Sequence, residues 1–223
     1  MKPHLLARSR PEPTSPRPRR TRSTHATRTL ANLIGAGGAA LFASAGYQHY
    51  HRTHSLVGAV FFAEQLWVVV AYLVRRRART LSSHPVDWLL ALGGTCGGLL
   101  FRPTGAHPHW GVIAGLDVQL LGLVYCLASF AALGRSFGFA AADRGIKRRG
   151  PYALVRHPLY SSYFLLLGGY LLQSVSWQNL LVVLFVCGCN IGRIRGEERV
   201  LGQNLDYEHY VHQVRWRLLP GVW

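Results

Sequence analysis

Long apolar runs separated by short basic segments constrain this chain more than any other feature of its sequence. Two of the runs, residues 55–74 and 110–133, are long enough to cross a hydrocarbon core, which takes about 20 helical residues. Four shorter runs lie at about 30–46, 86–101, 159–174 and 177–192. The pattern predicts an all-α, multi-pass transmembrane bundle. We expect about four spans followed by a C-terminal helical hairpin, formed by the last two runs, with a cytoplasmic catalytic loop and tail.

Composition separates this interpretation from the usual one for a basic protein. The chain is 49% hydrophobic and yet carries a formal net charge of +16. A nucleic-acid-binding domain would gather such charge on one folded surface. Here the basic residues lie between apolar segments that are too long to be left in water. We therefore expect an integral membrane protein surrounded by membrane lipid, and no nucleic-acid partner.

The basic residues also predict the orientation of the chain in the membrane. Lysine and arginine gather in the N-terminal tail, at 75–79, at 135–156 and at 193–223. If the N-terminus is cytoplasmic, all but Arg52 and Arg102 of the 25 lysines and arginines lie on the cytoplasmic side. Because cytoplasmic segments carry the excess of basic residues, both termini are predicted to be cytoplasmic.

Two regions of different character follow from composition. Residues 1–29 are rich in Pro, Arg, Ser and Thr and contain one acid, Glu12, so they cannot bury enough apolar surface to order themselves. We interpret them as a disordered basic tail, although an organelle transit peptide has a similar composition. Residues 30–223 form the integral membrane domain, and its catalytic half is predicted at 133–223.

The cysteines and loop histidines give little evidence of a metal site or a disulfide. All four cysteines lie inside apolar segments, where they are expected to pack as small side chains. Histidines cluster outside the spans without an accompanying carboxylate or cysteine, so we favour exposed loop residues over metal ligands. These histidines are His49, His51, His54, His107 and His109.

Two acids fall inside predicted spans. Glu64 and Asp117 each place a charge where the bilayer makes it costly, and such residues are often functional. They are expected either to line a substrate cavity or to pair with other polar groups of the bundle.

The polar segment that follows residue 133 is the best candidate for a functional site. A Gly-Pro turn and the His157-Pro158 break precede a helix that is predicted to start near Leu159. The free backbone N–H groups of this helix start, together with the side chains of Arg156, His157 and Tyr160, then meet at the membrane surface. Such an arrangement suits an anionic or polar ligand.

A second candidate lies where the last apolar run meets the cytoplasm. Glu197 and Glu198 are two of only nine acids in the chain, and Arg193 is four residues before Glu197 on one helical face. Taken alone, Arg193 and Glu197 would form an exposed salt bridge of small energetic value.

The segments GPYALVRHPLY (150–160) and EERVL (197–201), the late tyrosines and the RLLPGVW ending resemble the isoprenylcysteine carboxyl methyltransferase family. That family lies in a wider group with phospholipid methyltransferases, and the resemblance covers roughly residues 133–223. It implies a membrane-embedded methyltransferase that uses S-adenosylmethionine, without the soluble Rossmann-type fold. The methyl donor is expected between the loop at 150–160 and the helix that carries the two glutamates.

The resemblance also implies roles for individual residues. Arg193 is expected close to the substrate as the catalytic residue, Glu197 is expected to accept hydrogen bonds from the donor's ribose, and Glu198 is expected to be a helper or a surface charge. The residues implied in cofactor binding are Arg144, Gly145, Ile146, Lys147, Tyr152, His157, Pro158, Leu159, Tyr160 and Glu197.

The acceptor implied by the resemblance is lipophilic, such as a prenylcysteine-like carboxylate. A phospholipid amine, a small thiol or a quinone-like lipid remains an alternative acceptor. A different class is an NADPH-dependent membrane reductase, since sterol reductases carry a related RHP-containing C-terminal half; the EERVL segment favours the methyltransferase. A non-catalytic membrane scaffold would leave the polar loop unexplained.

The charge distribution makes the first testable prediction. Single cysteines at positions 52 and 147, in a variant without the four native cysteines, should react with an impermeant thiol reagent from opposite sides of sealed vesicles. The physical reason is the one-sided distribution of lysine and arginine. Labelling of both positions from the same side would show that the proposed orientation is wrong.

Overall fold

The structure is a computed structural model that describes residues 25–223 apart from residues 55, 77 and 103–108. It is mostly helical, which confirms the predicted class. The helices are α1 (His25–Thr53), α2 (Leu56–Val74), α3 (Pro85–Cys96), α4 (His109–Leu133), α5 (Pro158–Gln173), α6 (Trp177–Leu201) and α7 (Leu205–Gln213). Two short strands, β1 (Thr80–Leu81) and β2 (Ala142–Asp143), and three 3-10 helices, η1 (Gly97–Leu100), η2 (Gly134–Ser136) and η3 (Gly150–Ala153), complete the described elements.

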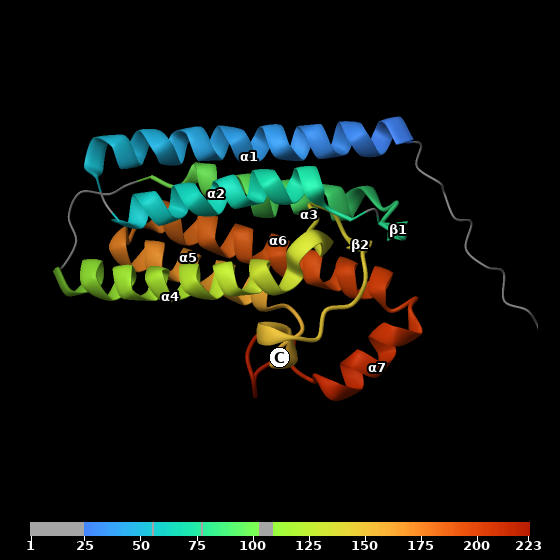
Figure 1. Ribbon diagram of the computed structural model, residues 1–223. Coiled ribbons are helices and arrows are strands. Elements are labelled where there is room, and N and C mark those ends of the chain that lie inside the picture. Colours follow the sequence, from blue (N-terminus) through green and yellow to red (C-terminus); the bar gives the residue numbers. More distant parts are fainter. Residues whose placement is uncertain (1–24, 55, 77, 103–108) are drawn as a thin grey trace, which may run out of the picture.

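Each apolar run of the sequence corresponds to one of the first six helices. The helix α1 is longer than its run and begins at His25, inside the range predicted for the tail, while residues 1–24 lie outside the described residues. Figure 1 shows the long helices in one bundle, with α7 outside it near the end of α6 and the loop that contains β2. The polar segments of the second half therefore gather at one end of the bundle.

Within the part of the chain that the structure describes, two helical segments are long and apolar enough to cross a membrane. They are His109–Ser136, which includes α4, and Trp177–Leu201, which is α6; Gln65–Val74 and Pro85–Leu100 are shorter apolar helical segments. Large apolar side chains such as Leu121 and Leu184 are exposed on their outer faces. An extensive exposed apolar surface is typical of a lipid-facing one, so the structure supports membrane association. The crossing of the membrane by the other helices remains a prediction.

Small residues allow the helices to pack closely. On α4, a Cβ added at Gly115 would lie 2.5 Å from the carbonyl oxygen of Gly169 on α5. On α3, a Cβ at Gly93 would lie 2.8 Å from Sγ of Cys189 on α6. Without a hydrophobic driving force between helices in lipid, such close backbone approach supplies much of the packing energy.

A buried asparagine fixes the start of α6. The side-chain amide of Asn179 donates to the carbonyl oxygens of Ser174 (2.7 Å) and Arg102 (2.9 Å) and accepts from the N–H of Arg102 at 3.1 Å. Ser176 caps the helix by accepting from the N–H of Asn179 at 3.1 Å. The α5–α6 turn and the segment before α4 are thus joined by groups whose hydrogen bonds are satisfied.

Short backbone pairings hold the polar loops at the opposite end of α6. The strand β1 pairs antiparallel with β2, with Thr80 opposite Asp143. The Asp143 carboxylate accepts from the N–H of Gly145 (2.8 Å) and from the side-chain amide of Asn204 (3.2 Å). Gly145 has a φ of +94°, a conformation that glycine adopts without strain. Asp143 therefore ties the loop after α4 to the turn between α6 and α7.

The span acids, loop histidines and cysteines of the sequence lie in different surroundings. Asp117 is exposed on α4, whereas the side chain of Glu64 lies outside the described residues. The rings of His51 and His54 lie 6.1 Å apart between centroids. Among the described residues, no group of three or more His, Cys, Asp or Glu side chains is arranged to hold a metal ion. Cys126 and Cys189 are buried in the helical packing.

The close contact of α4 with α5 generates a prediction on stability. Gly115→Ala should lower the free energy of unfolding by about 1–3 kcal/mol, because its Cβ meets backbone atoms that cannot move independently. The matched control is Gly168→Ala on α5, where an added Cβ meets nothing within 4 Å. Thermal unfolding of both purified variants in detergent measures the effect; equal midpoints for the two would contradict it.

Candidate functional site

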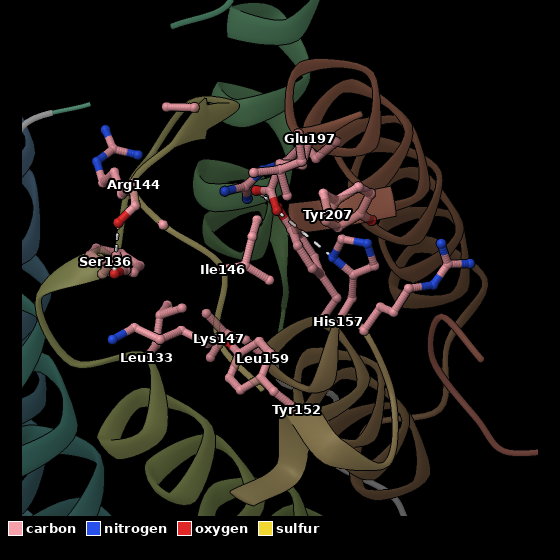
Figure 2. Close-up of a pocket in the computed structure, with 18 of the residues that line it drawn as sticks. Leu133, Ser136, Arg144, Ile146, Lys147, Tyr152, His157, Leu159, Glu197 and Tyr207 are labelled. Atoms are coloured by element: carbon pink, nitrogen blue, oxygen red, sulfur yellow. Dashed lines mark hydrogen bonds and ion pairs between the residues drawn. The ribbon is translucent and has the colours of Figure 1, made fainter. Parts of the chain in front are cut away.

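One pocket opens among the polar loops at the end of the bundle, and Figure 2 shows it with its lining side chains. Its empty space, including the open mouth, is about 840 Å³. The wall combines apolar side chains with several charged ones.

Five parts of the chain build this pocket. They are the segment 133–147, the η3 turn, the first residues of α5, the last turns of α6, and α7. The helix α5 begins at Pro158 because proline suits the first turn of a helix and disfavours helical geometry in the residue before it. His157 thus stands at the helix start with its ring directed into the site.

The structure brings together nearly all of the residues that the sequence suggested. Ten of them line the pocket: Arg144, Gly145, Ile146, Lys147, Tyr152, His157, Leu159, Tyr160, Arg193 and Glu197. Pro158 does not line it; as the first residue of α5, it is buried in the helix start. Its role is to set the backbone geometry that aims His157, so direct contact with a cofactor is not supported by its position.

A histidine lies between the two adjacent glutamates. His157 Nδ1 is 3.8 Å from Glu197 Oε2, and His157 Nε2 is 3.3 Å from Glu198 Oε1. The hydroxyl of Tyr160 donates to Glu197 Oε1. Because Glu197 lines the pocket and its carboxylate is approached from one side by these protein groups, its oxygens can also accept hydrogen bonds from a ligand.

Glu198 is the main site residue whose role the sequence left open. Its carboxylate pairs with Arg156 Nη1 at 2.9 Å and Arg217 Nε at 2.7 Å, and it accepts from the hydroxyl of Tyr207 at 3.2 Å. The side chain is only 13% exposed and does not line the pocket. Glu198 therefore organises the groups around the site, and its position next to Glu197 was the only signal in the sequence.

The C-terminal segment continues this network. The N–H groups of Arg156 and His157 donate to the carbonyl oxygens of Trp216 (2.8 Å) and Arg217 (2.9 Å). The guanidinium of Arg217 also lies 4.9 Å from the ring centroid of Trp223. The backbone before α5 is thereby fixed by residues about 60 positions later in the chain.

Arg193 is not the exposed salt-bridge partner that its spacing allowed. It donates from Nη2 to the carbonyl oxygen of Phe139 at 3.1 Å, and its guanidinium lies 5.3 Å from the ring centroid of Tyr160. Among the described residues, no ion pair within 4.0 Å joins Arg193 to Glu197. The two side chains both face the pocket and both contact Tyr160, Arg193 through the face of its ring and Glu197 through its hydroxyl.

Two tyrosines of α7 also line the site. The hydroxyl of Tyr210 donates to the carbonyl oxygen of Tyr152 at 2.7 Å, so α7 is fastened to the η3 turn. Burial, followed by the negative charge of Glu198, raises the pKa of Tyr207; burial likewise raises the pKa of Tyr152 and of Tyr210. All three are neutral phenols at physiological pH and act as aromatic walls and hydrogen-bond donors.

Arg144 stands apart from the other charged residues of the pocket. Its Nε is buried and has no hydrogen-bond partner among the described residues. Burial, followed by the positive charge of Arg75, lowers the pKa of Arg144 to about 10. The guanidinium is still protonated at neutral pH, so this part of the pocket carries positive charge.

Comparison with known proteins agrees with this site. Residues 110–206 match the model of the phospholipid methyltransferase family. The match covers α4, the pocket loops, α5 and α6, and it confirms the resemblance to the wider group of membrane methyltransferases. It indicates a methyltransferase and gives no support to a reductase. A comparison with curated proteins found no match.

The Glu198 network generates a prediction on stability. Glu198→Ala should lower the free energy of unfolding by about 3 kcal/mol, because it leaves the buried Arg156 without its carboxylate and removes one of the two carboxylates beside His157. Glu208→Ala on the exposed face of α7 removes the same charge and should change stability little. Chemical denaturation in detergent compares them; a small loss for Glu198→Ala would contradict the central role of this carboxylate.

Proposed function

We propose that this chain is an S-adenosylmethionine-dependent methyltransferase that acts on a lipophilic acceptor at the cytoplasmic face of a membrane. The observation that carries the proposal is the pocket itself. It lies almost entirely within the segment that matches the methyltransferase family, and it places a carboxylate, a histidine, tyrosines and arginines around one cavity next to apolar helices.

The residues present fit the proposed cofactor. S-adenosylmethionine supplies, when bound, an electrophilic methyl group on a sulfonium centre. Glu197 offers carboxylate oxygens to ribose hydroxyls, and Tyr152 and Tyr207 offer aromatic walls to an adenine ring or to a positive charge.

The proposed contribution of the protein is positioning. Holding two reacting groups in line can supply about 7–11 kcal/mol of a reaction barrier, and a sulfonium donor needs little acid–base assistance. Glu198 contacts the ring of His157 and pairs with Arg156, and the C-terminal segment accepts a hydrogen bond from the N–H of His157. These contacts fix the position of His157 in the pocket wall. Arg193, anchored on Phe139 and Tyr160, is placed to orient an acceptor that carries a negative group.

The acceptor that fits this arrangement is amphiphilic. The pocket wall includes Leu133, Phe137 and Tyr163, which continue into the apolar packing between the helices. A prenylcysteine-like carboxylate is the acceptor that we propose first. A phospholipid is the alternative, favoured by the description of the matching family, and a small thiol is a third possibility of the same reaction class.

The direct test uses the purified chain in detergent or in vesicles with total membrane lipid. Calorimetry should detect binding of S-adenosylmethionine, and a radiolabelled methyl group should pass from the donor into a lipid product that can then be identified. Binding of NADPH in place of S-adenosylmethionine would overturn the proposal in favour of a reductase, and binding of neither would favour a scaffold.

Arg193 and Glu197 allow the proposed division of roles to be tested. Glu197→Gln should raise the apparent binding constant of the donor about tenfold or more, because losing a charged hydrogen-bond partner typically costs about 1.5–3 kcal/mol. Arg193→Met should lower turnover or acceptor affinity while donor affinity stays near that of the wild type.

The matched control for Arg193→Met is Arg195→Met, which removes an exposed arginine two residues further along α6. It should behave as the wild type in both measurements. Wild-type kinetics in both Glu197→Gln and Arg193→Met would show that the pocket is not the site of methyl transfer.

A further inference from the structure

The pocket has two ends of different character. Figure 2 shows His157 and Tyr207 on one side and Arg144 and Ser136 on the other, with Ile146 between them. The His157 end is rich in paired charges, as described above. At the other end, the guanidinium of Arg144 extends away from Glu197 and His157.

Backbone pairing brings Arg75, at the end of α2, to the same end of the pocket. The N–H of Arg79 donates to the carbonyl oxygen of Asp143 at 2.7 Å, next to the β1–β2 pair. Ser136 Oγ donates to the carbonyl oxygen of Arg144 at 3.2 Å. The bond of Arg79, and that from the N–H of Arg76 to the carbonyl oxygen of Arg135 at 2.6 Å, join the chain after α2 to the loop that carries Arg144. The ring of Tyr72, over which the Arg75 guanidinium lies, packs 5.1 Å from the pocket residue Phe137, and the charge of Arg75 lowers the pKa of Arg144.

No direct ion pair balances the positive charge at this end among the described residues, although the charges of Glu197 and Asp143 act on Arg144 from a greater distance and raise its pKa. Arg75 Nε donates to the neutral side chain of Asn32 at 2.6 Å, and its guanidinium lies 5.0 Å from the ring centroid of Tyr72. Among the described residues, neither Arg75 nor Arg144 has an ion pair within 4.0 Å. Two partly buried guanidiniums without a carboxylate are costly unless an anion joins them.

The absence of a side chain at Gly138 makes room for the guanidinium of Arg144. A Cβ added at Gly138 would lie 2.1 Å from Nη1 and 2.5 Å from Cζ of Arg144. The guanidinium therefore lies flat against the backbone of the loop. A planar group held in this way presents its N–H donors in a fixed direction, which suits bidentate binding of a phosphate or carboxylate.

We propose that Arg75 and Arg144 form an anion subsite that receives the head-group phosphate of a phospholipid acceptor, at the opposite end of the pocket from the donor. A prenylcysteine-like carboxylate would not use this subsite, because that carboxylate is itself methylated and must lie beside the donor. This inference rests on the proposed function. It changes the role that the resemblance implied for Arg144: its backbone borders the donor pocket with Gly145 and Ile146, while its guanidinium serves the acceptor.

The position of the subsite indicates what kind of molecule carries the anion. Arg75 follows α2, whose outer face exposes apolar side chains such as Val70 and Leu73. It also lies outside the segment that matches the methyltransferase family. A lipid lying along α2 would bring a charged head group to the two arginines while its chain stayed among apolar side chains.

The experiment measures binding of two ligands separately on the full chain in dodecyl maltoside. One ligand is S-adenosylmethionine; the other is dodecyl phosphate, with dodecyl trimethylammonium as a cation of the same chain length and inorganic phosphate as an anion without a chain. Wild-type protein should bind dodecyl phosphate and not the cation. Arg144→Met should weaken dodecyl phosphate binding about tenfold or more while changing donor affinity less than twofold.

Two further variants secure the interpretation. Gly138→Ala should also weaken dodecyl phosphate binding, because its Cβ displaces the guanidinium without removing it, and only the end of a flexible side chain must move. Arg149→Met removes an exposed arginine from the same loop and should leave both affinities unchanged. An equal loss of dodecyl phosphate affinity in Arg149→Met would show that binding depends only on the general positive charge of the loop. That result would overturn the proposed subsite.

Three other outcomes would identify the source of the anion, reassign Arg144 or refute the proposed function. Binding of inorganic phosphate as tight as that of dodecyl phosphate, with the same dependence on Arg144, would identify a free anion rather than a lipid head group as the source. A tenfold loss of donor affinity in Arg144→Met with unchanged dodecyl phosphate binding would assign the guanidinium to the donor and overturn the proposal. Absence of donor binding in the wild type would instead refute the proposed function.

Discussion

The buried carboxylate of Glu198 is the interaction on which the functional end of this molecule depends. It joins α6 to the segment before α5 through Arg156 and His157, and to the C-terminal segment through Arg217. A single carboxylate can satisfy several donors because each oxygen accepts more than one hydrogen bond. Without it, two buried cationic or polar side chains would lose their partner, and the loop before α5 would be held only by its backbone pairing with the C-terminal segment.

The helical bundle supplies a rigid support for these polar segments. Close packing at Gly115 and Gly169 fixes α4 against α5, and glycines of α3 allow α6 to approach in the same way. The pocket is then built where α4 and α6 end and α5 begins. This position suits a reaction between a water-soluble donor and a membrane-embedded acceptor, since each reaches the end of the bundle from its own phase.

The two ends of the pocket divide the chemistry between matched and unmatched parts of the chain. The polar end with His157 and Glu197 lies within the segment that matches the phospholipid methyltransferase family. The anion subsite that we propose at the other end includes Arg75, which lies outside that segment and beside the pocket lining. An acceptor subsite made partly from the N-terminal helices would allow the acceptor to change while the donor pocket is retained.

The sequence by itself determined the helical class, the positions of six apolar helices and ten of the 21 residues that line the pocket. Apolar runs and proline breaks are local signals, and the RHPLY and EERVL segments carry a resemblance that points to Arg193, Glu197 and His157. It did not assign the role of Glu198, whose partners are separated from it by up to about 40 positions, nor that of Arg75. Only the tertiary structure decided that Arg193 turns to Phe139 rather than to Glu197, and that the charge of Arg75 acts on Arg144, which forms no ion pair among the described residues. The reason is physical: the partner of a charged side chain is set by which backbones fold against each other, and spacing along one helix cannot specify it.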